Sequence, residues 1–315
     1  MSAAFQHITV LRDEVVAALG ETPAGWVVDC TLGGGGHSEA MLQARADHSV
    51  LGLDRDPDAL AAATARLAPF GPRFVARQST FGALGEVCAE RGLSAVAGVV
   101  ADLGVSSPQL DRPERGFSFR EDGPLDMRMD PTSGEPVLEL LRRARAEELA
   151  DVLYHYGDVE RSRRLSRIIV EAIGEGVSGT SELAARIARA VPGRPKIHPA
   201  TRVFQALRIW VNDELGEVER LMAAAPALLH PGGVLAVISF HSGEDRIVKH
   251  AMRALAPKDG EFELVTRKSE QPSEAETARN PRARSARLRI LRRRHPDDPP
   301  RLSRKARRAL EEAAA

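Results

Sequence analysis

The stretch Asp29-Cys-Thr-Leu-Gly33-Gly34-Gly35-Gly36-His37-Ser38 closes an apolar run at residues 26–31 and leads into an alanine-rich helical pattern from about residue 38. Glycines at such a strand-to-helix turn let the backbone approach a ligand closely and leave the helix N-terminus open to it. A second strand pattern at residues 49–53 ends at Asp54, twenty-one residues past Gly33. A carboxylate there can accept both ribose hydroxyls of an adenosine-containing cofactor. The stretch therefore predicts the first turn of an α/β sheet that binds such a cofactor.

Strand and helix patterns alternate outward from this turn. Further strands are expected at residues 73–76 and 96–101, with helices at about 59–67 and 81–91. After an irregular stretch at 108–134, only helical periods appear, near 136–156, 160–174 and 181–191. The α/β pattern then returns, with a long helix at about 201–229, a strand at 234–240, a helix at 244–255 and strand candidates at 261–267 and 283–290. The sequence predicts a doubly wound parallel sheet interrupted by an all-helical insertion.

Composition excludes several classes of protein. The 315 residues are 43% hydrophobic and 28% charged, which is typical of a globular chain with one large or two ordinary domains. Cys30 and Cys88 lie far apart, which excludes a disulfide scaffold and a cysteine-based zinc site. The longest apolar run, residues 234–238, is too short to span a bilayer, so we expect a cytoplasmic protein without a membrane partner.

The zero net charge hides an asymmetry along the chain. Residues 279–308 contain thirteen Arg and Lys against two acids, which gives this segment +11 and the remainder −11. A basic segment on an acidic body indicates a partner that carries phosphate, because each neutralised phosphate releases counterions. A solvated tail is the alternative reading.

Finer features favour one adenosine cofactor over another. Ser38 stands where the third glycine of a dinucleotide fingerprint would fall if counted from Gly33. Carboxylates at the ends of the first and fourth strands, Asp29 and Asp102, suit a cofactor that bears an ammonium and a sulfonium charge. We therefore expect S-adenosylmethionine, and a nicotinamide-dependent oxidoreductase is the alternative class.

Two further turns at the same sheet edge carry polar side chains. The fourth strand is followed by Asp102-Leu-Gly-Val-Ser-Ser-Pro-Gln109. The carboxylate of Asp102 can accept a hydrogen bond from the cofactor's methionine moiety or from an attacking amine. Ser239-Phe240-His241-Ser242 follows the fifth strand. His241 is a candidate base, a surface for base stacking or a polar residue at a helix start. A metal site from His241, Glu244 and Asp245 lacks other clear ligands nearby, so no metal is expected.

Four polar residues share one stripe of the helix expected from residue 201. Thr201, Gln205, Arg208 and Asn212 recur at spacings of four, three and four. Their amides and guanidinium are able to read a base or hold phosphate, and a solvated helix face is the alternative. Arg202, beside this stripe, completes the candidate substrate-binding set on this helix.

Several segments together resemble a known family. They are residues 29–38, Asp102-Leu-Gly-Val-Ser-Ser-Pro-Gln-Leu, Arg115-Gly-Phe-Ser-Phe, Gly123-Pro-Leu-Asp-Met-Arg-Met-Asp, His198-Pro-Ala-Thr-Arg, Arg208-Ile-Trp-Val-Asn and Ser239-Phe-His-Ser. Across roughly residues 5–291 the chain is similar to the RsmH (MraW) family of bacterial 16S ribosomal RNA (cytosine-N4)-methyltransferases. The resemblance implies a class I S-adenosylmethionine-dependent methyltransferase domain, a Rossmann-like doubly wound sheet, with a helical insertion. Gly243 departs from the leucine that the family usually has there, and we expect it to loosen the helix start.

The same resemblance implies specific contacts and a substrate. It implies that the cofactor is bound by Gly35, Gly36, His37, Asp54, Phe81, Asp102 and Gln109. The implied substrate is one cytidine of the decoding region of 16S rRNA in the small ribosomal subunit, methylated on its exocyclic amine, and no DNA partner is expected. A non-catalytic RNA-binding protein is a third class, against which the intact cofactor motifs argue.

The chemistry of an aromatic amine sets the remaining expectations. The lone pair of the cytosine amine is delocalised into the ring, so the enzyme must orient the amine and accept its N–H hydrogen bonds. Asp102 and His241 are the candidate acceptors. An RNA base must also be splayed out and gripped, for which the loop bearing Arg115, Phe117 and Phe119 is a candidate, with simple packing as the alternative. We expect methyltransferase parts at 1–110 and 200–291, a substrate-recognition insertion at 111–199 and a basic tail at 292–315.

Overall fold

The computed structural model describes residues 9–193, 196–258 and 260–298 and contains a seven-stranded sheet in the order β3-β2-β1-β4-β5-β7-β6. The strands are β1 (Gly25–Asp29), β2 (His48–Asp54), β3 (Phe74–Gln78), β4 (Val96–Asp102), β5 (Leu229–Ser239), β6 (Phe262–Leu264) and β7 (Arg287–Arg293). The first five are parallel, and β7 pairs antiparallel with β5 and β6. The chain order reverses between β1 and β4, which places a topological switch point there. The expected doubly wound α/β sheet is confirmed.

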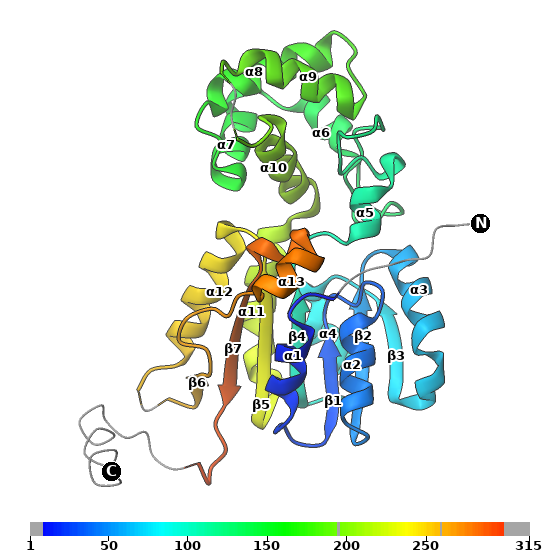
Figure 1. The fold of residues 1–315 in the computed structure, drawn as a ribbon, viewed down its shortest axis with the longest axis vertical. Helices are drawn as coiled ribbons and strands as arrows, with labels where there is room; N and C mark the ends of the chain where they lie inside the picture. The colour runs from blue at the N-terminus through cyan, green and yellow to red at the C-terminus, as the bar shows by residue number, and fades with distance from the viewer. Residues whose placement is uncertain (1–8, 194–195, 259, 299–315) are drawn as a thin grey trace.

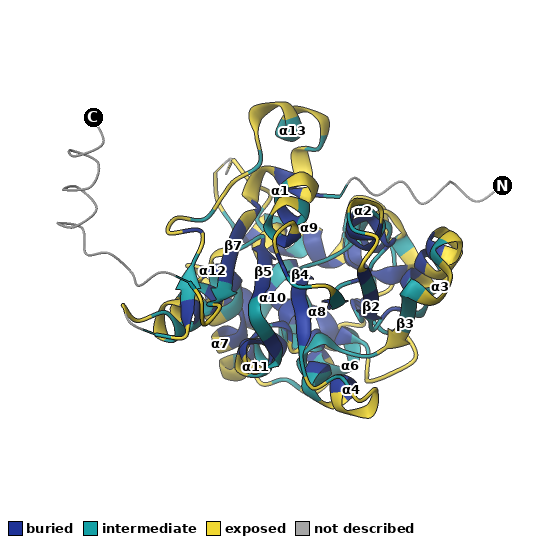
Figure 2. Cartoon of the chain, turned by 90° about the horizontal axis from the view of Figure 1, so that it is seen from below, coloured by how far each residue is buried: buried dark blue, intermediate teal, exposed yellow. Residues whose placement is uncertain are grey.

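Helices cover both faces of this sheet because its central strands are apolar on both sides. In β1, Val27 packs with α1 (Arg12–Leu19), α2 (Gly36–Ala44) and α3 (Pro57–Leu67). The next residue, Val28, packs with α4 (Leu84–Glu90), α11 (Glu214–Leu228) and α12 (Ser242–Leu255). Figure 2 shows the buried strands between these two layers. The near-continuous hydrophobic runs of β1 and β4 are therefore typical of a parallel sheet with both faces covered.

The helical insertion has a hydrophobic core of its own, away from the sheet (Figure 1). It contains α6 (Val137–Arg143), α7 (Ala146–Gly157), α8 (Ser162–Gly174), α9 (Thr180–Ala190) and α10 (Ala200–Asn212). Two short elements, α5 (Ser107–Asp111) and η3 (Pro113–Arg115), lead into it from β4. We assigned α10 to the second methyltransferase part, but Val203, Phe204 and Leu207 of α10 are buried in this helical core.

Two helices expected as continuous are broken. The expected helix at 201–229 is α10 followed by α11, because Asp213 has a left-handed backbone with φ of 49°. The expected helix at 136–156 is α6 followed by α7, because Ala144 and Arg145 are extended. Neither break contains Gly or Pro, and the first is marked only by Asn212 and Asp213, a weaker signal that rests on the tolerance of Asn and Asp for the left-handed conformation.

The C-terminal part also differs from expectation. The predicted strand at 283–290 begins only at Arg287, after α13 (Glu274–Arg279) and the 3₁₀ turn η4 (Pro281–Ser285). Arg292 and Arg293, which we placed in the tail, lie in β7 and pair with Glu263 and Glu261. Much of the basic segment is thus neutralised within the fold. The expected tail from residue 299 onward lies outside the described residues, and none of the described helices is long and apolar enough to cross a membrane.

Candidate active site

A cavity of about 590 Å³ opens at the carboxyl ends of β1, β2 and β4. Its floor is formed by the turns after these strands, and residues of the helical insertion and of η4 form its outer wall. The floor includes Thr31, Gly33, Asp54, Asp102 and Leu103, and the remaining wall includes Phe81, Gln109, Arg120, Met129, Arg208 and Arg284. Open α/β sheets bind ligands at this edge, beside the switch point, so this cavity is the candidate active site.

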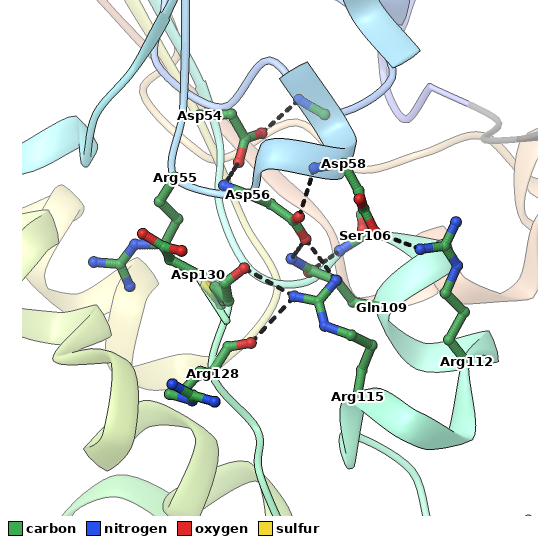
Figure 3. A network of polar contacts seen from close by, with 12 residues as sticks. Asp54, Arg55, Asp56, Asp58, Ser106, Gln109, Arg112, Arg115, Arg128 and Asp130 are labelled. Carbon is green, nitrogen blue, oxygen red and sulfur yellow. Dashed lines mark hydrogen bonds and ion pairs between the residues drawn. The ribbon is translucent and has the colours of Figure 1, made fainter. Parts of the chain in front are cut away.

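Asp54 ends β2 and carries the carboxylate predicted to bind ribose. Its Oδ2 accepts a hydrogen bond from Gly33 N at 2.7 Å, and its Oδ1 accepts one from Asp56 N at 2.9 Å (Figure 3). Gly33 has φ of 50°, a left-handed conformation that glycine adopts without strain. Burial raises the pKa of Asp54 to about 6, although the two backbone hydrogen bonds oppose this shift. The carboxylate is therefore fixed at the cavity wall and mostly ionised at neutral pH.

The glycines at the start of α2 are packed closely against their neighbours. A Cβ atom on Gly35 would lie 3.0 Å from Leu67 Cδ1, and one on Gly36 would lie 1.9 Å from Thr9 Oγ1. Neither glycine is among the described residues that line the cavity, and the same holds for His37. In this structure these two glycines let α2 pack against α3 and the N-terminal segment, so their predicted contact with a cofactor stays a prediction.

His37 and Asp102 form a buried pair, of which only Asp102 lines the cavity. Asp102 ends β4, and its Oδ2 is 3.6 Å from Nε2 of His37, which is only 5% exposed. Burial opposes a charged imidazole, but the carboxylates of Asp102 and Asp29 raise the pKa of His37 above its ordinary value. Within the described part of the chain, both ring nitrogens of His37 and Oδ1 of Asp102 lack a hydrogen-bond partner. Unpaired buried polar atoms are rare in native folds, so their concentration here marks a place where a ligand completes the site.

Gln109 and Arg115 meet at the carboxylate of Asp56 (Figure 3). Asp56 Oδ2 accepts hydrogen bonds from Gln109 Nε2 at 2.9 Å and from Arg115 Nη1 at 2.8 Å. Gln109 Oε1 accepts from Ser106 N, and Arg115 Nη2 donates to Met129 O at 2.8 Å. Gln109 lines the cavity, but its amide is engaged. The guanidinium of Arg115 is buried against protein, so the geometry makes it a positioning residue and argues against the expected contact with RNA.

The stripe on α10 is used mainly inside the protein. Asn212 accepts from Met129 N and donates to Met127 O and Arg208 O, all at 2.8 Å. Arg208 reaches the cavity wall, but its fork donates to both oxygens of Glu214, at 2.7 and 2.8 Å. Burial disfavours the charged guanidinium, yet Glu214 raises the pKa of Arg208. Asn212 therefore fixes the Met127–Met129 loop, and Arg208 carries little free charge.

The other predicted substrate residues lie in the helical insertion. Phe117 is buried in its core, and Phe119 packs edge-on against Phe204 with ring centroids 4.9 Å apart. Arg202 is exposed and donates to Asp158 O, and Gln205 is partly buried. None of Phe117, Phe119, Arg202 and Gln205 is among the described residues that line the cavity. For the two phenylalanines, the structure favours the packing alternative.

His241 caps α12 and does not reach the cavity. Its Nδ1 accepts from Glu244 N at 3.4 Å, and its Nε2 lies 3.1 Å from Glu244 Oε1. Glu244 Oε2 in turn accepts from His241 N at 3.3 Å, which completes a capping box, and it also accepts from Phe240 N. The capping box is formed in spite of Gly243, so the expected loosening of this helix start is not seen. Nε2 of His241 has no hydrogen-bond partner among the described residues, but His241 lies outside the cavity lining, which argues against it as the acceptor of an amine proton.

A cluster of possible metal ligands surrounds this cap. Ligand atoms of Glu214, His241 and Glu244 lie within 4.8 Å of one another. However, Arg208 already neutralises Glu214, and Asp245, which the sequence placed with them, pairs instead with Arg289 Nε at 2.8 Å. The cluster is an ion-pair network that joins α10, α11 and α12.

Sequence analysis did not identify Thr31, Arg120, Arg282 and Arg284 as site residues. Thr31 Oγ1 accepts a hydrogen bond from Asp102 N at 2.6 Å and lines the cavity, and its position within the glycine-rich stretch was an available signal. The three arginines lie at the outer wall. Arg282 and Arg284 were counted only as part of the basic C-terminal segment, because their proximity to the cavity depends on the pairing of β5 with β7.

Comparisons with known proteins agree with the resemblance. The profile of the MraW methylase family matches residues 4–294. The chain is 50% identical to Ribosomal RNA small subunit methyltransferase H of Methylobacterium sp. (strain 4-46), covering 90% of this chain and 89% of that protein. It is 48% identical to the protein of the same name from Synechococcus elongatus, covering 92% and 96%. A solved putative rRNA-methylase from Clostridium thermocellum covers 91% of this chain and 100% of that one at 12% identity and a TM-score of 0.45, a likeness too remote to inform the site. On the family profile and these relatives, the chain belongs to the MraW methylase family.

Proposed function

We propose that this protein transfers a methyl group from S-adenosylmethionine to the exocyclic N4 amine of a cytidine in the decoding region of 16S rRNA. The single observation that carries the proposal concerns Asp102, which lines the cavity and whose buried Oδ1 has no hydrogen-bond partner among the residues that the structure describes. Family membership and the names of the relatives support a ribosomal RNA of the small subunit as the substrate. Ribosomal subunits are assembled in the bacterial cytoplasm, where we place the reaction.

The cavity fits S-adenosylmethionine by the chemistry of its floor. The Asp54 carboxylate is placed to accept the ribose hydroxyls, and the Phe81 ring lines the wall where an adenine would pack. Asp102 adds a carboxylate at the end of β4, and Asp29, at the end of β1, adds a second one whose pKa is raised by burial. A cofactor with an ammonium and a sulfonium group is favoured in such surroundings, whereas a dinucleotide would bring the charge of its pyrophosphate toward these carboxylates.

When bound, the cofactor supplies the methyl group. Asp102 is placed to accept an N–H hydrogen bond from the cytosine amine and to hold it in line for attack. The N4–carbon bond forms as the sulfur–carbon bond breaks, and the amine loses one proton. We assign that proton to the Asp102 carboxylate, which then releases it to solvent. His37, whose Nε2 lies 3.6 Å from Asp102 Oδ2, is the positioning partner of this carboxylate.

The structure supports only part of the predicted acceptor and substrate sets. Asp102 is favoured over His241 because only Asp102 lines the cavity. We propose that the helical insertion, extended by α10, recognises the RNA, and that Arg115 and Asn212 position its loop. The expected domain bounds at 110, 199 and 291 remain predictions within this proposal.

Methyl transfer to undermethylated small subunits tests the proposal. The purified protein would be incubated with tritiated S-adenosylmethionine and 30S subunits that lack the modification, and the labelled nucleoside mapped by mass spectrometry. N4-methylated cytidine at one site is the expected product, and Asp102→Asn should abolish it while retaining cofactor binding. Label on another nucleoside would overturn the proposed acceptor. In calorimetry, NAD binding without S-adenosylmethionine binding would favour the oxidoreductase, and RNA binding without transfer would favour a non-catalytic protein.

A further inference from the structure

The candidate active site has two ends of opposite charge. Asp54 and Asp102 lie at its floor, where the strands end. Arg120, Arg282 and Arg284 line its outer wall, and all three are exposed. A cationic cofactor and an anionic nucleic acid backbone would thus be attracted to different ends of one cavity.

The outer arginines differ from the other arginines of this cavity in what their side chains bond to. Arg208 is bound to Glu214, and Arg55 donates to Asn212 O and lies 3.8 Å from Glu217. By contrast, across the described ranges the guanidinium groups of Arg120 and Arg284 have neither a hydrogen bond nor an ion pair. Arg282 donates to both carboxylate oxygens of Asp111, at 3.1 and 2.5 Å, but both side chains are about half exposed. Water and salt screen such an exposed pair, so an incoming anion can replace it.

The two unpaired arginines are held on opposite parts of the fold. Arg284 lies on η4, which is fixed to the sheet part by the buried side chains of Ala283 and Ala286. Arg120 follows Phe119, which packs in the helical insertion, and its N–H donates to Ser118 Oγ. Figure 1 shows the segment around α13 at the sheet end that faces the insertion. An RNA strand that delivers a base to Asp102 would therefore meet Arg284 on the sheet part of the fold and Arg120 on the helical insertion.

We propose that Arg120 and Arg284, assisted by Arg282, bind the backbone phosphates on either side of the target nucleotide. The inference deepens the proposed function and rests on it. Guanidinium groups bind phosphate through two parallel hydrogen bonds, and such contacts position a nucleic acid without reading its sequence. The phosphate contacts hold the backbone at the rim while the base extends toward the floor.

This inference can be tested by comparing arginine variants with a matched control variant. The variants are Arg120→Ala, Arg284→Ala and the double variant. The control is Arg253→Ala, since Arg253 is also exposed, makes no ion pair among the described residues and lies outside the cavity lining. KM and kcat for undermethylated 30S subunits would be measured over a series of KCl concentrations, and the Kd of S-adenosylmethionine by calorimetry.

Each variant has a distinct expected result. Each single substitution should raise KM for the subunit by roughly tenfold and reduce the slope of log affinity against log salt by about 0.7 to 0.9 per lost phosphate contact. The Kd of S-adenosylmethionine should stay within about twofold, because this cofactor has no phosphate. Variants whose KM and salt slope match those of Arg253→Ala would overturn the inference, as would an unchanged salt slope with a weakened cofactor Kd. If the wild-type protein methylates no RNA, the proposed function fails instead, and the two failures are thereby distinguished.

Discussion

Replacing Arg115 by alanine tests whether this arginine binds RNA or positions the site. Its ion pair with Asp56 is buried, with side chains 10% and 4% exposed. Three residues earlier, Arg112 forms a similar pair with Asp58, with side chains 44% and 60% exposed. The two pairs share their chemistry and both link the β4-to-insertion segment to α3, so they differ mainly in burial. Arg112→Ala is therefore a matched control.

The structure sets the size of the expected effect. Arg115→Ala removes the partner of a buried carboxylate and the donor to Met129 O. Removing one member of a buried ion pair costs about 3 to 5 kcal/mol in the free energy of unfolding. Asp56 keeps its bonds to Gln109 and Asp58 N, so we expect the lower end, about 3 kcal/mol. An exposed pair such as that of Arg112 contributes less than about 1 kcal/mol.

Urea and thermal denaturation of the wild type and both variants, without ligands, measure the difference. A loss of about 3 kcal/mol corresponds to a fall in Tm of roughly 4 to 5 °C for Arg115→Ala, against less than about 2 °C for Arg112→Ala. Equal stability of the two variants, together with weakened RNA binding by Arg115→Ala alone, would refute the positioning role and restore the expected contact with substrate.

Four other substitutions test the site. Asp54→Asn should weaken S-adenosylmethionine binding in calorimetry, and the wild-type affinity should fall as the pH drops through about 6, where Asp54 gains a proton and loses acceptor capacity; a flat profile from pH 5 to 8 would contradict this. Asp102→Asn should lower kcat by roughly 100-fold or more. His241→Ala should retain most turnover and lose about 1 kcal/mol of stability, because it removes the helix cap. A larger loss of kcat in His241→Ala than in Asp102→Asn would restore His241 as the acceptor. Asn212→Ala should destabilise the protein by about 3 kcal/mol in urea, because it breaks three bonds and leaves the N–H of Met129 buried and unpaired; a loss below about 1 kcal/mol would contradict this.

The sheet and the positions of Asp54 and Asp102 were predictable from sequence for a local reason. Each residue ends a strand whose apolar run is uninterrupted, and the carboxyl ends of parallel strands meet at one edge. The break at Asp213 was harder to predict, because no Gly or Pro marks it and only the weaker preference of Asn and Asp for the left-handed conformation is present. Its cause is tertiary, since Asn212 is tied to the Met127–Met129 loop and the next helix must turn to pack on the sheet.

The roles of Arg115 and Asn212 were not predictable because a polar side chain in a motif has the same identity whether it faces a ligand or another part of the chain. Which of the two it faces depends on partners that are distant in the sequence. Asn212 bonds to the backbone of Met129, 83 residues away, and Arg115 pairs with Asp56, 59 residues away. Both converge on Met129, whose N–H goes to Asn212 and whose carbonyl goes to Arg115. Met129 itself lines the cavity. Polar residues of these motifs therefore shape the cavity through the backbone that they hold, and a change at either should alter the position of the wall without removing any contact to a ligand.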